Sequence, residues 1–79
     1  METLKIGLLW FDDDPKRSLE VKISDGARRY REKFGKAPNA CYVNPLALEK
    51  GKAQIGELQV VAARHILPHH FLLGIMDQR

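Results

Sequence analysis

Three consecutive aspartates, Asp12, Asp13 and Asp14, are the residues of this chain that most directly suggest chemistry. They follow an apolar run, so their carboxylates would lie together at the carboxyl end of a strand. Clustered carboxylates suit Mg²⁺, which takes hard oxygen ligands and often a phosphate oxygen of the substrate. One hypothesis is therefore a metal site for phosphoryl or phosphodiester chemistry.

The same segment also has a structural interpretation, which the sequence favours. Pro15 follows Asp14, and proline fits the first position of a helix, where its missing N–H costs nothing. The Asp14 carboxylate could then accept a hydrogen bond from the free amides of the first helical turn. Asn44 and Pro45 repeat this arrangement without an acidic cluster. We therefore expect Asp14 to cap a helix, and we expect neither a metal site nor a cofactor.

The histidines and the cysteine offer weaker hypotheses. His65 and His69 have the spacing of a zinc-binding pair on a helix, but Pro68 between them interrupts a helix. His69 and His70 would point to opposite faces of an extended chain. A nucleophilic pair of Cys41 with a histidine stays open, although no motif surrounds it. We expect the histidines to lie in a turn and at a strand end, without catalysis.

A basic segment provides the alternative function. Residues 16–36 contain eight Lys and Arg residues against three acidic residues, a local net charge of +5. On a helix these cations could neutralise the phosphates of nucleic acid. The candidates are Lys22, Arg29 and Lys33 on one flank, with Arg28 and Arg31 across the other flank. The ordinary alternative is a solvated helix face with charge pairs at i,i+4 spacing. The pairs expected are Asp25 with Arg29, Arg28 with Glu32, and Glu32 with Lys36.

One long helix, over residues 15–34, is expected to carry these cations. Its apolar side chains recur at steps of three and four, which places them on one stripe. The stripe consists of Leu19, Ile23, Ala27, Tyr30 and Phe34. Gly35 fits a left-handed cap at the end of this helix, and Pro38 follows it.

Short apolar or alternating runs predict strands at residues 4–11, 39–44, 57–63 and 70–76. Residues 57–63 also fit a helix, and 45–51 should form one or two helical turns. The first two strands, joined by the long helix, should run parallel, and the last two should pair antiparallel. The sequence therefore predicts an α+β fold: a small mixed sheet, in the order β-α-β-short α-β-β, with one long helix on one face.

The face of the sheet away from that helix is the strongest candidate for function. Side-chain alternation places Leu9, Phe11, Leu72 and Met76 on it, and one helix can cover only the opposite face. A contiguous exposed apolar patch usually marks a partner site, and a symmetric homodimer is the commonest way to bury it. The alternative is that residues 45–51 and 64–69 fold over this face.

Length and composition limit the remaining possibilities. Seventy-nine residues make one domain, 1–79, and the single cysteine, Cys41, excludes an internal disulfide and favours the cytoplasm. The net charge of +3 does not by itself imply an anionic partner. The start of the chain lacks a secretory signal, and no apolar run approaches the roughly 20 residues of a membrane span. We therefore expect a small, soluble binding module that forms a homodimer and has no catalytic activity.

Overall fold

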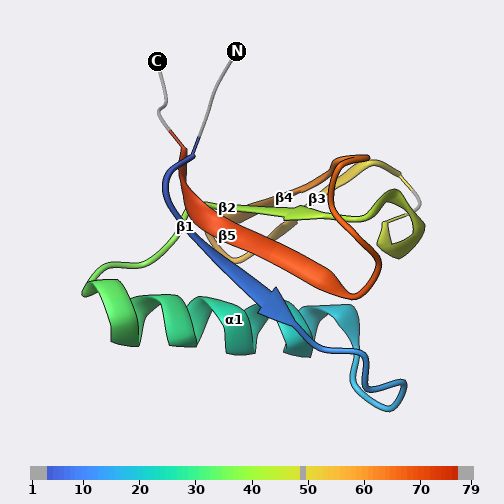
Figure 1. Cartoon of the computed structure of the whole chain (residues 1–79), viewed down its shortest axis with the longest axis horizontal. Coiled ribbons are helices and arrows are strands. Elements are labelled where there is room, and N and C mark those ends of the chain that lie inside the picture. The colour runs from blue at the N-terminus through green and yellow to red at the C-terminus, as the bar shows by residue number, and fades with distance from the viewer. Residues whose placement is uncertain (1–3, 49, 77–79) are drawn as a thin grey trace.

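The computed structural model describes residues 4–48 and 50–76 of the chain. Its elements are β1 (Leu4–Phe11), α1 (Leu19–Phe34), β2 (Ala40–Val43), the 3-10 helix η1 (Pro45–Ala47), β3 (Lys52–Ile55), β4 (Leu58–Ala62) and β5 (His70–Met76). The five strands form one mixed sheet, and α1 lies against one of its faces (Figure 1). The predicted α+β class is confirmed, with the long helix on one face.

The sheet has the strand order β1-β5-β2-β4-β3. β5 pairs antiparallel with both β1 and β2, β2 pairs parallel with β4, and β3 pairs antiparallel with β4. β1 and β2 therefore run in the same direction, as predicted, but with β5 between them. The predicted pairing of the last two strands is wrong, because β2 separates β4 from β5.

The middle of the chain differs most from the prediction. Of the predicted one or two helical turns in residues 45–51, one is present, the three-residue η1, and β3, which the sequence did not predict, follows it. β3 joins β4 through a two-residue loop, Gly56 and Glu57, because Ile55 pairs with Leu58. Gly56 has φ 61°, a positive angle that glycine readily adopts in such hairpins. The segment 57–63 forms a strand, as preferred, and not a helix.

α1 begins four residues later than predicted. Ser18 is its N-cap, and the Ser18 hydroxyl oxygen accepts a hydrogen bond from the Val21 N–H at 3.2 Å. The C-terminal end follows the prediction: Gly35 has φ 80°, and its N–H donates to the Arg31 carbonyl at 2.8 Å. The helix thus has both ends capped, over 16 residues.

The hydrophobic core lies between α1 and the sheet. Its fully or nearly fully buried members come from the helix and from three strands: Ile23, Tyr30, Cys41, Val43, Leu58, Val60, Phe71 and Leu73. The remaining stripe residues of α1 pack against this cluster, so the predicted stripe is confirmed. Gly26 brings helix and sheet into close approach, because a Cβ there would lie 2.9 Å from Leu73 Cδ1 and 3.0 Å from Trp10 Cδ1.

Candidate functional site

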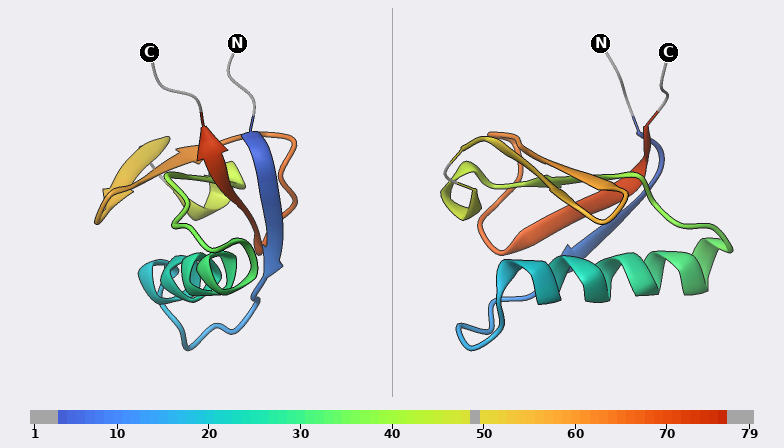
Figure 2. Two further views of the ribbon diagram at one scale, coloured as in Figure 1. Left: turned by 90° about the vertical axis from the view of Figure 1, so that its left-hand side faces the viewer. Right: turned by 180° about the vertical axis from the view of Figure 1, so that it is seen from behind.

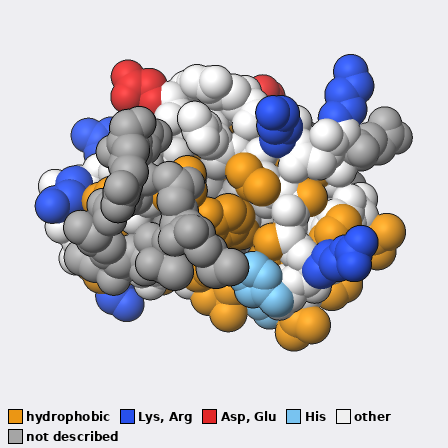
Figure 3. Space-filling model, turned by 90° about the horizontal axis from the view of Figure 1, so that it is seen from above, with side chains coloured by type: hydrophobic (Ala, Val, Ile, Leu, Met, Phe, Trp, Pro, Cys, Tyr) orange, Lys and Arg blue, Asp and Glu red, His pale blue; other side chains and the backbone are white. Residues whose placement is uncertain are grey.

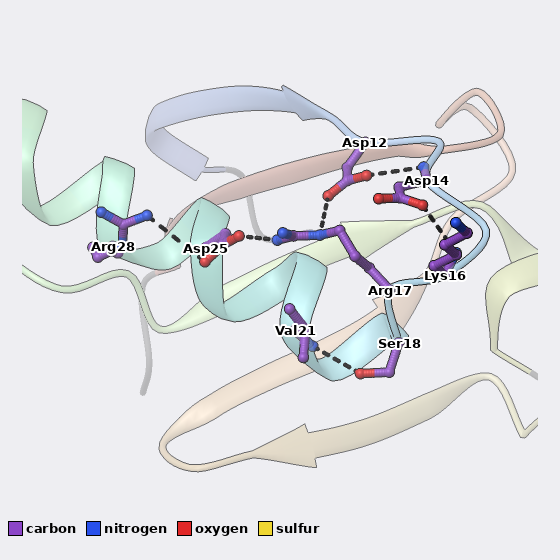
Figure 4. A network of polar contacts seen from close by, with 8 residues as sticks. All are labelled: Asp12, Asp14, Lys16, Arg17, Ser18, Val21, Asp25 and Arg28. Atoms are coloured by element: carbon purple, nitrogen blue, oxygen red, sulfur yellow. Dashed lines mark hydrogen bonds and ion pairs between the residues drawn. The ribbon is translucent and has the colours of Figure 1, made fainter.

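Arg17 connects the loop that contains the three aspartates, between β1 and α1, to the helix itself (Figure 4). Asp12 Oδ1 accepts a hydrogen bond from the Asp14 N–H at 3.0 Å, and Asp12 Oδ2 lies 3.0 Å from Arg17 Nε. The Arg17 guanidinium also pairs with the Asp25 carboxylate on the helix. Asp25 in turn lies 3.7 Å from Arg28. These contacts join the end of β1 to the first turns of α1.

Asp14 bonds within the loop and not to the helix. Its carboxylate accepts the N–H of Lys16 at 2.9 Å. The prediction that Asp14 caps the helix and Pro15 begins it is therefore wrong, since Ser18 caps a helix that starts at Leu19. Over residues 4–48 and 50–76, no three His, Cys, Asp or Glu side chains are grouped so that they could hold a metal ion.

The cysteine and the histidines are dispersed over the described structure. Cys41 is fully buried, and this burial raises the pKa of its thiol to about 12. The thiol is therefore both inaccessible and protonated at neutral pH, which makes it a poor nucleophile. His65 and His69 are exposed, and His69 has φ 66°. His70 lies at the start of β5, where Nδ1 is 2.9 Å from the Pro68 carbonyl oxygen.

The structure distributes the five predicted nucleic-acid-binding residues over three surfaces. Arg29 and Lys33 line a pocket beside β1. Arg28 and Arg31 line a groove of about 640 Å³ between α1 and the β3-β4 hairpin. Lys22 lies with His69 and His70 along a third hollow. Figure 2 shows the reason for this separation: β1 descends along one flank of α1, whereas β3 and β4 lie on its other side.

The pocket beside β1 has a volume of about 290 Å³ and combines an aromatic wall with cations. The Arg29 guanidinium carbon lies 5.5 Å from the centroid of the Trp10 ring, within cation–π range. The predicted pair of Arg29 with Asp25 is therefore wrong, because Asp25 contacts Arg17 and Arg28 instead. The buried Nε1 of Trp10 has no hydrogen-bond partner among the described residues.

The face of the sheet opposite α1 carries a continuous row of apolar residues. Strand register places Leu9 opposite Leu72, Leu72 opposite Tyr42, and Tyr42 opposite Val61. Leu9 is 60% exposed and its neighbour on this face, Phe11, is 54% exposed. Figure 3 views this face directly, and hydrophobic side chains gather over its middle and along one rim. We call this surface, centred on β1, β5 and β2, the open face.

Contacts along the open face make it a shallow, ordered platform. The Tyr42 hydroxyl lies 3.2 Å from the Met76 sulfur, and Leu72 Cδ1 would be 3.3 Å from a Cβ added to Gly7. Phe11 and His70, which are opposite each other in the register, have ring centroids 4.9 Å apart. The platform is therefore built from side chains that already support one another across strands.

Residues 45–51 and 64–69 do not cover the β1 side of the open face. Leu9 and Phe11 keep their exposure, and Leu46 and Leu67 within those two segments are themselves 88% and 66% exposed. Ile66 is buried, and the Asn44 side-chain amide donates to its carbonyl at 2.8 Å. Asn44, directly before the first of these segments, thus contacts the second, while Leu9 and Phe11 at the edge of the sheet stay exposed.

No family model matches this chain, and no match to it was found among curated proteins or solved structures. Within the described part of the chain, no helix combines the length and the apolar character that a membrane crossing requires. A function can therefore be inferred only from the chain's own residues and their geometry.

The structure brings together the residues that the sequence assigned to the interface and adds others to them. Leu9, Phe11, Leu72 and Met76 all belong to the open face, as the side-chain alternation indicated. Half-buried Tyr42 and Val61 extend the same row across the sheet. The pairing of Phe11 with His70 depends on the register of two strands that are distant in sequence, so no local pattern could indicate it.

Proposed function

We propose that this protein is a small, non-catalytic interaction module that forms a symmetric homodimer through the open face. The observation that carries this proposal is the exposure of Leu9 and Phe11, 60% and 54%, beside the apolar row of β5 and β2. Contiguous exposed apolar surface of this kind usually marks a contact site. In a two-fold contact, each chain would present the same row to its partner.

The composition of the open face suits such an interface. Its apolar centre gives way to polar residues on the β3 side, where Lys52 lies opposite Val61 and Gln54 opposite Gln59. Stable interfaces commonly combine an apolar centre with a polar rim. Burying a whole Leu or Phe side chain is worth about 1.5–3 kcal/mol. Covering the exposed parts of Leu9 and Phe11 in both chains would therefore contribute about 4–6 kcal/mol before association costs.

A cytoplasmic location belongs to the same proposal, and the single free cysteine supports it. The absence of catalysis is supported by the inaccessible thiol of Cys41 and by the loop and helix contacts of Asp12. Nucleic-acid binding through α1 stays a prediction. The division of its candidate cations between opposite flanks of the helix gives it less support than the open face has.

Light scattering at high protein concentration tests the dimer. The parent protein should have twice the chain mass of 9.0 kDa, and Phe11→Lys should return it to a monomer with an unchanged circular dichroism spectrum. Leu46→Lys is the matched control, because Leu46 is more exposed than Phe11 but lies on η1. A monomeric parent, or equal effects of the two substitutions, would contradict the proposal.

A further inference from the structure

The two edges of the sheet differ in length and polarity. β3 is a four-residue edge whose first three residues, Lys52 to Gln54, are exposed and mostly polar. β1 is an eight-residue edge, and its sequence is mostly apolar. Sheet proteins commonly keep their edges short, charged or covered, because unpaired backbone groups attract further strands. From Gly7 to Phe11, β1 has neither a charged residue nor a proline, so this part of the edge does not follow the rule.

Only part of β1 is regular enough to accept a strand. Between Leu4 and Gly7, three steps along β1 oppose two steps along β5, which is the mark of a β-bulge. From Gly7 to Phe11 the register with β5 is continuous, residue for residue. Gly7–Phe11 is therefore the straight segment of this edge.

The orientation of the backbone groups follows from one hydrogen bond. The Asp12 N–H donates to the His69 carbonyl at 3.0 Å, which places Asp12 among the residues that bond toward β5. In an antiparallel ladder this orientation alternates. Leu8 and Trp10 therefore direct their N–H and C=O groups toward β5, whereas Leu9 and Phe11 direct theirs away from the sheet.

The two sides of this edge have different chemistry. Leu9 and Phe11 place apolar side chains on the open face. On the helix side, Leu8 and Trp10 line the pocket that Arg29 and Lys33 also line. Glu32 borders this pocket as well, but its carboxylate lies 3.6 Å from Arg28. No acidic side chain of the described residues forms an ion pair with Arg29 or Lys33, so the pocket presents positive charge.

We propose that the Gly7–Phe11 edge of β1 binds an extended segment of another protein in which acidic and apolar residues alternate. Such a segment would add a sixth strand, and its backbone would bond to the outward groups of Leu9 and Phe11. Residues of the bound segment that lie opposite Leu9 and Phe11 would direct their side chains to the open face. The intervening residues would face Arg29 and Lys33, where carboxylates are favoured.

The cations also discriminate between partners. A second copy of this chain, paired through its own β1, would bring its Arg29 and Lys33 toward the same two residues of the first copy. This like-charge contact disfavours edge-to-edge self-association and favours an acidic strand. The surface goes beyond the proposed homodimer, which buries the open face and leaves the backbone of this edge unpaired.

The test uses three fluorescein-labelled synthetic peptides of equal length: alternating glutamate and valine, alternating lysine and valine, and a block arrangement of the glutamate–valine composition. Binding is followed by fluorescence anisotropy at low ionic strength. The alternating glutamate–valine peptide should bind most tightly, and amide NMR shifts should concentrate at Gly7, Leu9 and Phe11. Absence of binding, equal binding of all three peptides, or shifts centred on β3 would overturn the proposal.

Charge variants separate this site from general attraction to a basic protein. Arg29→Glu with Lys33→Glu should weaken binding of the alternating glutamate–valine peptide about tenfold, since each exposed ion pair contributes modestly. Arg31→Glu with Lys52→Glu makes the same charge change away from β1, because Arg31 lines the groove toward the β3-β4 hairpin and Lys52 lies on the opposite edge strand, β3. It should weaken binding less than threefold by the same reasoning. Equal losses in the two double variants would refute a site at β1.

Leu9→Pro tests the backbone contact directly. Proline removes only the outward N–H of this edge position, a place where strands tolerate it. Binding should be lost, whereas Leu9→Ala should retain most of it. If Leu9→Pro does not fold, the backbone contact is tested on the peptide instead, with two peptides N-methylated at one or the other set of alternate residues. One of them should lose binding, and undiminished binding of both would overturn the proposal. The mass of the unliganded protein, measured separately, reports on the homodimer alone.

Discussion

Gly26→Ala is the substitution whose effect the structure determines most directly. Gly26 lies in the middle of α1 and is buried against the sheet. An added Cβ would lie 2.9 Å from Leu73 Cδ1 and between 3.0 and 3.2 Å from two ring atoms of Trp10. Leu73 is fully buried and Trp10 is a rigid ring, so neither neighbour can move freely. We therefore expect the variant to strain the contact between helix and sheet.

Two opposing contributions determine how far Gly26→Ala changes the free energy of unfolding. Replacing glycine by alanine inside a helix stabilises it by about 1 kcal/mol when nothing obstructs the methyl group. Inserting a methyl group into a packed interior costs about 1–3 kcal/mol. The free energy of unfolding should therefore fall by about 1 kcal/mol, which lowers the melting temperature of a chain of this size by about 4–8 °C.

Urea unfolding followed by tryptophan fluorescence measures this effect, because Trp10 is the only tryptophan and lies at the altered contact. Ser24→Ala is the control, since Ser24 is exposed on the same helix. It should raise the free energy of unfolding by a few tenths of a kcal/mol through helix propensity alone. A Gly26→Ala protein stabilised by about 1 kcal/mol would refute the close packing of α1 on Trp10 and Leu73.

Two further predictions concern the helix cap and the buried thiol. Ser18→Ala should lower the free energy of unfolding by about 0.5–2 kcal/mol, and Asp14→Ala by less, because Ser18 caps α1 and Asp14 bonds only within an exposed loop; chemical denaturation compares them, and a larger loss in Asp14→Ala would contradict this assignment. The pKa of Cys41 is raised to about 12 by burial, so above its ordinary value near 9.0 only the unfolded chain releases this proton. Stability should then fall between about pH 9 and pH 12, by up to about 1.4 kcal/mol per pH unit, and Cys41→Ala should remove that part of the slope. An identical slope in parent and variant would show that the thiol is not the titrating group.

Local periodicity predicted the parts of the fold that depend on side-chain direction. The α1 stripe and the two sides of β1 and β5 follow from spacings of 3.6 and 2 residues, which hold wherever the strand or helix lies. The start of α1 was mispredicted because aspartate side chains compete with helical bonding by accepting hydrogen bonds from nearby amides. Asp12 and Asp14 do this, and the helix begins only after Ser18. Serine directly before the first stripe residue, Leu19, was the available signal.

Long-range order was less accessible to prediction. β3 contains only one β-branched residue, Ile55, and its exposed side chains give no alternating pattern, although the Gly56–Glu57 loop is typical of a hairpin. The insertion of β5 between β1 and β2 depends on contacts between residues distant in sequence. The position of Arg29 over Trp10 depends in turn on that order, because it requires β1 to lie beside the flank of α1.

The contrast between the two sheet edges argues that the β1 surface is used for contact. One sheet contains both a short polar edge, β3, and a long apolar edge, β1, so the difference is not a general property of this chain. Leu9 and Phe11 contribute little to the core, since more than half of each side chain is exposed. Polar residues at these positions would leave the core intact and would protect the edge. Their apolar character is therefore unexplained by folding, and this supports the proposed contact with a partner.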